Sequence, residues 1–231
     1  MWITYSMNKE DMWLSRVPVP ITSKVSSHVN EVFNQLSPGK ELEYWNIFSP
    51  LWASAKIEKA PDGTRALTLR DKDRYDYAKA ERVIPASKKV AIEFSVIPSQ
   101  SDKGSLQIEF TDARGTAASR LIFDAEGMLS AKVGYRNSGV IKYEAGKEYT
   151  IRIELDRDKR IYNLFVNGQS RGAKIQFAPV ASFERVIFRT GDVRRFPDAD
   201  TPTDQSYDLE NAGTPVSEAV YYIKSFKTSA Y

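Results

Sequence analysis

Three arginines and one aspartate gather where a predicted strand runs into a long polar segment. The sequence at this point is FRTGDVRR, and its charged residues are Arg189, Asp192, Arg194 and Arg195. A planar guanidinium group donates paired hydrogen bonds that suit a carboxylate, including the carboxylate of a uronic or sialic acid. A network of ion pairs with the aspartates of the polar segment is the commoner arrangement for such a cluster. A contact site for an acidic sugar is the functional alternative, with these four residues as its candidate contacts.

Aromatic side chains form a second cluster, LEYWNIFSPLW, at residues 42–52. In one interpretation, Trp45 and Trp52 form a platform on which sugar rings stack, and both residues are then carbohydrate contacts. In the other, the segment is a strand whose large rings fill one end of a hydrophobic core, because large aromatic side chains usually contribute to packing.

Carboxylates recur in the stretch LRDKDRYDY, which contains Asp71, Asp73 and Asp76. A Ca²⁺ ion needs six to eight oxygen ligands, and the spacing here does not match an EF-hand loop. Lys72 and Arg74 lie between the carboxylates and weaken the case for a bound cation. We expect a charged corner between a strand and a loop, with a calcium site as the alternative.

Composition excludes several other classes of site. The chain of 231 residues has no cysteine, so it has no disulfide and no Cys-ligated metal. A single histidine, His28, argues against a His-based metal site and against a Ser-His-Asp triad. The 33 basic residues nearly balance the 30 acidic ones, which argues against a nucleic-acid partner. We find no phosphate-binding loop, nucleophile elbow or HExxH motif, and we assign no catalytic residue.

The elements that must hold these clusters are strands, and the clearest pair lies at residues 149–171. Ile151, Ile153 and Leu155 alternate with charged residues, which is the period of a strand with one apolar face. A second strand, IYNLFV, ends at Asn167-Gly168, the dipeptide most typical of a tight hairpin turn. A sheet with one apolar face needs a second layer to cover it.

Short strands of the same kind recur from residue 66 to residue 227, and turn residues separate them about every 8–12 positions. This spacing predicts an all-β fold, an antiparallel β-sandwich or jelly roll. Residues 190–218 interrupt the pattern with a long polar loop, and loops of this length in a compact domain are usually functional or disordered. No run of about 18 apolar residues is present, so we expect no membrane span.

The first part of the chain has a different pattern. Two short alternating segments at 2–6 and 12–17 predict a β-hairpin, and the proline-containing sequence VPVP follows as an extended linker. Apolar residues at helical spacing in 25–36 predict a short helix. We therefore divide the chain into a hairpin with its proline linker at 1–20, a helical connector at 21–44 and the sandwich at 45–231.

Three stretches of the chain resemble one family. Residues 2–20, WITYSMNKEDMWLSRVPVP, resemble the closing strands of sialidase-like proteins that carry a six-bladed propeller of BNR repeats. The stretches WNIFSPLW at 45–52 and FRTG at 188–191 resemble the C-terminal module after the propeller, a jelly roll of the concanavalin A and laminin-G type. The resemblance covers essentially the whole chain. It implies a concanavalin-like jelly roll preceded by a hairpin that is the remnant of a propeller blade.

The resemblance also implies a function. The catalytic residues of sialidase-like enzymes lie on the propeller, so no catalytic role transfers to a residue of this chain. The expected function is that of a non-catalytic, lectin-like accessory module, which binds a polysaccharide or packs on the missing propeller domain. The parent protein is then secreted or periplasmic, although the first residues lack the pattern of a signal peptide.

Two other functions stay open at this point. Concanavalin-like sandwiches also host glycoside hydrolases and polysaccharide lyases, and a pair of carboxylates on the concave face would support an enzyme of that kind. A purely structural module, which stabilises a propeller and binds nothing else, would instead show a large exposed apolar surface. Fold analogy alone does not choose among these functions.

Overall fold

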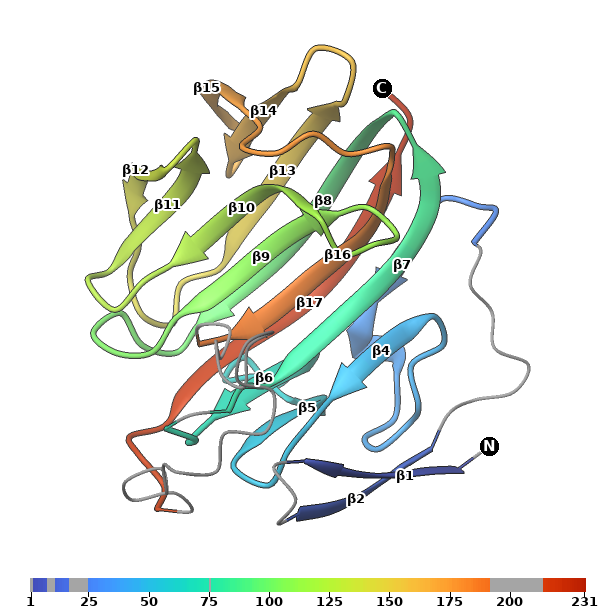
Figure 1. Ribbon diagram of the computed structural model, residues 1–231. Helices are drawn as coiled ribbons and strands as arrows, with labels where there is room; N and C mark the ends of the chain where they lie inside the picture. Colours follow the sequence, from blue (N-terminus) through green and yellow to red (C-terminus); the bar gives the residue numbers. More distant parts are fainter. Residues whose placement is uncertain (1, 8–10, 17–24, 75, 192–213) are drawn as a thin grey trace.

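The computed structural model describes residues 2–7, 11–16, 25–74, 76–191 and 214–231. From residue 25 onward, these residues form two antiparallel sheets that pack face to face, with the seven-stranded sheet in front of the eight-stranded sheet in Figure 1. The predicted all-β sandwich is therefore confirmed.

Each sheet combines strands from distant parts of the chain. In spatial order, the seven-stranded sheet contains β12 (Arg136–Lys142), β11 (Met128–Val133), β10 (Ala117–Phe123), β9 (Leu106–Thr111), β16 (Phe183–Thr190), β7 (Lys79–Ser87) and β4 (Trp45–Phe48). The eight-stranded sheet contains β15 (Gln169–Ile175), β14 (Ile161–Val166), β13 (Tyr149–Asp156), β8 (Lys89–Pro98), β17 (Ala219–Ser229), β6 (Arg65–Asp71) and β5 (Ala53–Lys59), with β3 (Asn30–Val32) paired to β17 beside this path.

The core lies between the two sheets, where the inward side chain of every second residue is buried. On β13, Ile151, Ile153 and Leu155 are fully buried, whereas Arg152 and Glu154 between them are only partly covered. This is the alternation that the sequence predicts for a sheet with one apolar face.

Three phenylalanines connect the sheets at the centre of the core. Phe188 of β16 packs edge to face on Phe94 of β8, with ring centres 5.1 Å apart, and its ring lies 6.2 Å from that of Phe226 of β17. All three side chains are completely buried. Aromatic pairs in this geometry contribute about 0.5–1.5 kcal/mol beyond the area that they bury.

The hairpin turn at Asn167-Gly168 has the expected geometry. Asn167 has φ 51° and Gly168 has φ 76°, so both central residues adopt the positive φ that a type I′ turn requires. The turn joins β14 to β15, and the Asn167 side chain also accepts a hydrogen bond from the amide of Thr150 at 2.8 Å.

The helix predicted over residues 25–36 is wrong for most of its length. The segment contains β3 and a single 3₁₀ turn, η1 (Phe33–Gln35). Thr228 of β17 binds the segment twice, because its hydroxyl accepts from the amide of Val29 and its own amide donates to the Val29 carbonyl, both at 2.9 Å. The open side of β17 thus holds this segment as a strand, and Phe33 enters the core. No helix in the part of the chain that the structure describes is long and apolar enough to cross a membrane.

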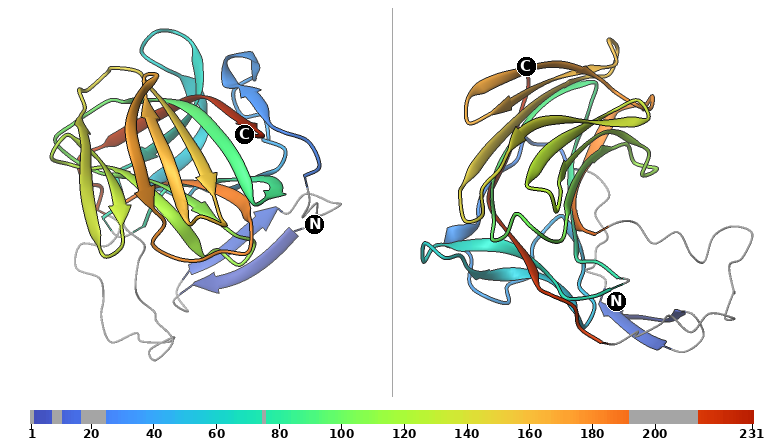
Figure 2. Two further views of the ribbon diagram at one scale, coloured as in Figure 1. Left: turned by 90° about the horizontal axis from the view of Figure 1, so that it is seen from above. Right: turned by 90° about the vertical axis from the view of Figure 1, so that its left-hand side faces the viewer.

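The N-terminal hairpin is confirmed as a separate two-stranded sheet. It pairs β1 (Trp2–Met7) with β2 (Asp11–Arg16) in continuous register. Trp2, Met12 and Leu14 are 63%, 79% and 61% exposed. In both views of Figure 2 the hairpin lies at the periphery of the sandwich.

The contact between the sheets gives a prediction about stability. We expect Phe188→Ala to lower the free energy of unfolding by about 3–5 kcal/mol, because it leaves a cavity between the sheets. Ile175→Ala is the control, since this β15 side chain is 61% exposed, and it should change the free energy by less than about 0.5 kcal/mol. Urea denaturation measures both values, and equal midpoints for the two variants would contradict this account of the core.

Candidate functional site

Charged side chains cover the outer face of the seven-stranded sheet. On β16, Val186 and Phe188 point into the core, so Arg185, Ile187 and Arg189 lie on the outer face. Arg189 is therefore placed on this face by the same alternation that buries Phe188. The neighbouring strands β7 and β9 add further polar residues to it.

The register between strands aligns these residues in rows across the sheet. Ile187 pairs with Glu81 of β7 on one side and with Glu109 of β9 on the other. Residues directly opposite each other on paired strands share a face. The two carboxylates thus lie on the outer face on either side of an isoleucine.

Each carboxylate is held by cationic side chains. Glu81 accepts a hydrogen bond from Arg185 at 2.6 Å, and Lys79 lies 3.4 Å from its other oxygen. Glu109 accepts from Nε of Arg120 at 2.8 Å and also contacts Nη2 of the same guanidinium. Both glutamates are less than a tenth exposed, because these contacts cover them.

Arg189 is held between polar and aromatic partners. Its Nη2 donates to Oε1 of Gln107 at 2.8 Å and lies 3.9 Å from Oε1 of Glu109. Its guanidinium carbon lies 5.5 Å from the ring centre of Tyr77, which in turn packs on Phe48 at 5.4 Å. Such cation–π contacts fix the orientation of the guanidinium group.

A second cation–aromatic contact lies further along the same face. The ring of Phe177 is 5.8 Å from the guanidinium carbon of Arg120 and 4.8 Å from the ammonium of Lys132. We call the whole arrangement the polar strip. It consists of the aromatic residues Phe48, Tyr77 and Phe177, the cations Lys79, Arg120, Lys132, Arg185 and Arg189, and the polar or acidic residues Glu81, Gln107 and Glu109.

The structure separates the residues that the sequence predicts as carbohydrate contacts. Arg189 belongs to the polar strip. Trp45 is 7% exposed, packs on Phe33 and Phe188, and donates from its indole nitrogen to Glu31 at 2.8 Å, so it is part of the core. Trp52 is partly exposed and lies in the turn before β5. Asp192, Arg194 and Arg195 lie outside the described residues.

Sequence reasoning missed most of the strip. Glu109 and Gln107 alternate with apolar residues on β9, and this alternation is visible in the sequence. What the sequence does not show is that β9 lies next to β16. Glu109 and Arg189 are therefore recognised as neighbours only once the order of the strands is known.

The acidic corner at Asp71, Asp73 and Asp76 uses its carboxylates to bind the backbone. Oδ1 of Asp71 accepts from the Asp73 amide at 2.8 Å, and Oδ1 of Asp73 accepts from the Asp76 amide at 2.9 Å. The carboxylate of Asp76 accepts from the amide of Tyr77 at 3.0 Å. Among the residues whose placement is described, no group of three or more histidine, aspartate or glutamate side chains is arranged to hold a metal ion.

The carboxyl group of Asp71 has a raised pKa. Burial raises its pKa from 3.8 to about 6, and the nearby charges of Asp73 and Asp76 act in the same direction. Hydrogen bonds from the Thr190 hydroxyl and the Asp73 amide oppose the shift. Because Asp71 ends β6 of one sheet and Thr190 ends β16 of the other, this carboxyl group lies between the ends of two strands from different sheets.

Two comparisons with known proteins both point to sialidase-like proteins. A family model described as "Sialidase-like, CBM domain" matches residues 45–205. Among solved structures, a chain titled "Sialidase" is 44% identical over 100% of this chain, with a TM-score of 0.92. Only 21% of that chain is covered, so the present chain spans about a fifth of its length. A search of curated proteins found no match.

More distant solved structures share the fold. The endo-β-1,4-glucuronan lyase from the fungus Trichoderma reesei is 10% identical with a TM-score of 0.55, over 86% of this chain and 96% of the lyase. The β-glucanase of Bacillus licheniformis is 12% identical with a TM-score of 0.55, over 90% of this chain and 100% of the glucanase. At these identities the likeness concerns the fold alone.

The raised pKa of Asp71 predicts how stability depends on pH. The folded protein binds this proton more tightly than the unfolded chain, so the contribution of Asp71 to stability falls as the pH rises from about 4 to about 6, and it is constant above that window. Above about pH 6 the charged carboxylate of Asp71 lowers the free energy of unfolding by about 1–3 kcal/mol, and Asp71→Asn should remove this penalty.

Urea midpoints at several pH values between 4 and 7.5 test this prediction. The difference in unfolding free energy between the wild type and Asp71→Asn isolates the effect from that of other carboxyl groups, such as Asp62, whose pKa is lowered to about 2 by Lys224 and Thr64. A difference that does not vary with pH would show that Asp71 titrates normally.

Proposed function

The chain belongs to the family of sialidase-like carbohydrate-binding domains, and we propose that it binds glycan chains on the polar strip as a non-catalytic module of a longer glycan-processing protein. The strip is the observation that carries the proposal. It combines oriented guanidinium groups with aromatic rings on the outer face of one sheet, where Arg120, Lys132 and Arg185 are partly exposed and Arg189 is 4% exposed. Binding sites of this kind place a few fixed polar groups among apolar ones.

The strip has donors that a ligand could use. Arg120 directs Nε and Nη2 to Glu109, and no contact with another described residue uses its Nη1. The ammonium of Lys132 rests on the ring of Phe177 and forms no ion pair with a described residue. Both cations are therefore positioned before a ligand arrives, which lowers the entropy lost on binding.

The charge of the strip favours an acidic glycan. Five cationic side chains stand against the two carboxylates of Glu81 and Glu109, which leaves an excess of positive charge on this face. A uronate or a sialic acid would place its carboxylate against a guanidinium group in the paired geometry that arginine favours. Attraction of this kind weakens as salt is added, because exposed charges are screened.

An enzyme is the second candidate, because two carboxylates share the outer face. Strand spacing places the backbones of Glu81 and Glu109 about 10 Å apart, since one strand separates them. The general acid of a glycosidase must be free to give its proton to the leaving group. Both glutamates instead accept hydrogen bonds from guanidinium groups, which occupy their oxygens. The contacts thus support binding more than hydrolysis.

The hairpin supports an additional structural role. Its exposed apolar side chains, Trp2, Met12 and Leu14, lie on a sheet of their own. Exposed apolar surface of this kind marks an interaction site. We propose that the hairpin packs against a propeller domain elsewhere in the same longer protein, and that 1–20 and 45–231 are separate units. A secreted or periplasmic location would bring such a protein to its glycan.

A matched pair of double variants tests glycan binding. We expect Arg120→Ala together with Lys132→Ala to weaken retention on an acidic polysaccharide at least tenfold at a temperature where circular dichroism shows the variant folded. Loss of the Arg120 contact with the buried Glu109 should also lower the melting temperature. Arg171→Ala together with Lys174→Ala removes the same charges from β15 of the other sheet and should leave retention unchanged. Affinity electrophoresis in gels that contain the polysaccharide measures the retention. Equal retention of the two double variants would exclude the strip as the binding face.

A deletion tests the role of the hairpin. Removal of residues 1–16 should change the free energy of unfolding by less than about 0.5 kcal/mol, because the hairpin has its own sheet. It should also reduce the binding of an apolar dye, since exposed tryptophan and leucine side chains are lost. Failure of the shortened chain to fold would show that the hairpin is part of the sandwich.

A further inference from the structure

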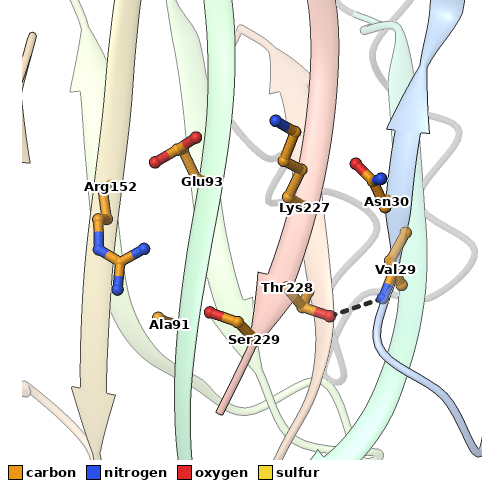
Figure 3. A pocket seen from close by; sticks show the side chains of 8 residues that line it. All are labelled: Val29, Asn30, Ala91, Glu93, Arg152, Lys227, Thr228 and Ser229. Atoms are coloured by element: carbon orange, nitrogen blue, oxygen red, sulfur yellow. Dashed lines mark hydrogen bonds between the residues drawn. The ribbon is translucent and has the colours of Figure 1, made fainter. Parts of the chain in front are cut away.

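A hollow of about 260 Å³ lies on the outer face of the eight-stranded sheet, on the opposite side of the sandwich from the polar strip. Figure 3 shows the side chains that line it, which come from β13, β8, β17 and the segment at β3. The lining residues that carry the following argument are Asn30, Ala91, Glu93, Arg152, Lys227 and Ser229.

The hollow exists because a small residue interrupts a row of longer ones. Ala91 of β8 pairs with Glu154 of β13 on one side and with Ser229 of β17 on the other. Its methyl group is buried and forms the floor. Because Ala91 alternates with Ile92 of the core, it faces outward and lies at the bottom of the hollow, beneath the longer side chains around it.

The next row along the strands supplies the polar groups. Glu93 pairs with Arg152 of β13 and with Lys227 of β17, and Lys227 pairs in turn with Asn30 of β3. The carboxylate of Glu93, an acceptor, thus lies between the donors Arg152 and Lys227. The amide of Asn30, which can both donate and accept, lies on the other side of Lys227. Figure 3 shows these four side chains side by side on four neighbouring strands.

The contacts within this row leave the side chains of Glu93 and Lys227 available to a ligand. Arg152 donates from Nε and Nη2 to Oε1 of Glu154, at 3.2 and 3.0 Å, so its guanidinium is fixed. Neither Glu93 nor Lys227 forms a hydrogen bond or an ion pair through its side chain with another residue of the described part of the chain. A carboxylate that is flanked by cations but bound by neither is ready to accept hydrogen bonds from a ligand.

We propose that this hollow is a second glycan site, which holds one residue of a neutral saccharide. Adjacent sugar hydroxyls donate and accept at once, which matches the alternation of Glu93 with its cationic neighbours. Glu93 and Glu154 balance the charges of Arg152 and Lys227, so the site lacks the excess of positive charge that distinguishes the polar strip. The volume is below the ~300–1,000 Å³ of pockets for drug-sized ligands, which limits the site to about one sugar ring.

Two sites on opposite faces would make the domain bivalent. An acidic segment bound on the polar strip and a neutral residue bound in the hollow could belong to one glycan or to two. Linked binding events raise the overall affinity without any new contact. The domain would therefore bind a dense glycan matrix more tightly than it binds a single chain.

Titration of the ¹⁵N-labelled chain with methyl glycosides of glucose, galactose, mannose and N-acetylglucosamine tests the proposal. We expect at least one of them to give saturable shifts of the amides of Ala91, Glu93 and Ser229. Glu93→Ala should weaken this binding at least tenfold, because it removes the central acceptor. Glu126→Ala, at an exposed turn, is the matched control and should bind normally. The double variant of Arg120 and Lys132 should also bind normally.

The outcomes separate this inference from the proposed function. Saturable shifts confined to the strands of the polar strip would overturn the second site and leave glycan binding on the strip intact. Shifts around Ala91 with glucuronate and with none of the neutral glycosides would overturn the ligand class. Undiminished binding by Glu93→Ala, or no saturable shift near the hollow with any sugar, would overturn the site itself. Loss of polysaccharide retention by the strip variants alone bears only on the proposed function.

Discussion

The contact of Phe188 with Phe94 and Phe226 joins the two sheets, and the position of both outer faces follows from it. Because strand residues alternate between faces, burial of Phe188 requires Arg189 to lie on the opposite side of β16. In the same way, burial of Phe94 places Glu93 on the outer face of β8. The core therefore determines which charged residues can meet a ligand, even though it touches none.

Much of the fold can be predicted from local sequence, and most of the candidate site cannot. Asn167-Gly168 and the alternation in β13 and β14 are local signals, and the structure agrees with both. The segment at 25–36 has apolar residues at helical spacing, but β17 provides an open edge and a hydroxyl partner, so tertiary contacts outweigh the helical pattern. Arg189 could be identified from its sequence neighbourhood alone.

The other members of the site depend on the order of the strands. Arg120, Glu109 and Arg189 come from three strands that are adjacent in the sheet, but β16 is far from the other two in the sequence. Trp45 shows the opposite difficulty, because its aromatic neighbourhood favours packing but is also consistent with a sugar platform, and the structure places it in the core. Residue type alone does not distinguish these two environments, whereas the face of the strand does.

The position of β17 has a consequence for how the protein forms during synthesis. β17 lies between β8 and β6 in the middle of the eight-stranded sheet, although its residues, Ala219–Ser229, come after every other strand in the chain. Until the ribosome releases them, β8 and β6 have no partner on their facing sides, and unpaired strand edges promote association with other chains. The eight-stranded sheet can therefore be completed only after translation has passed residue 229, and a shorter nascent chain leaves these two strand edges unpaired.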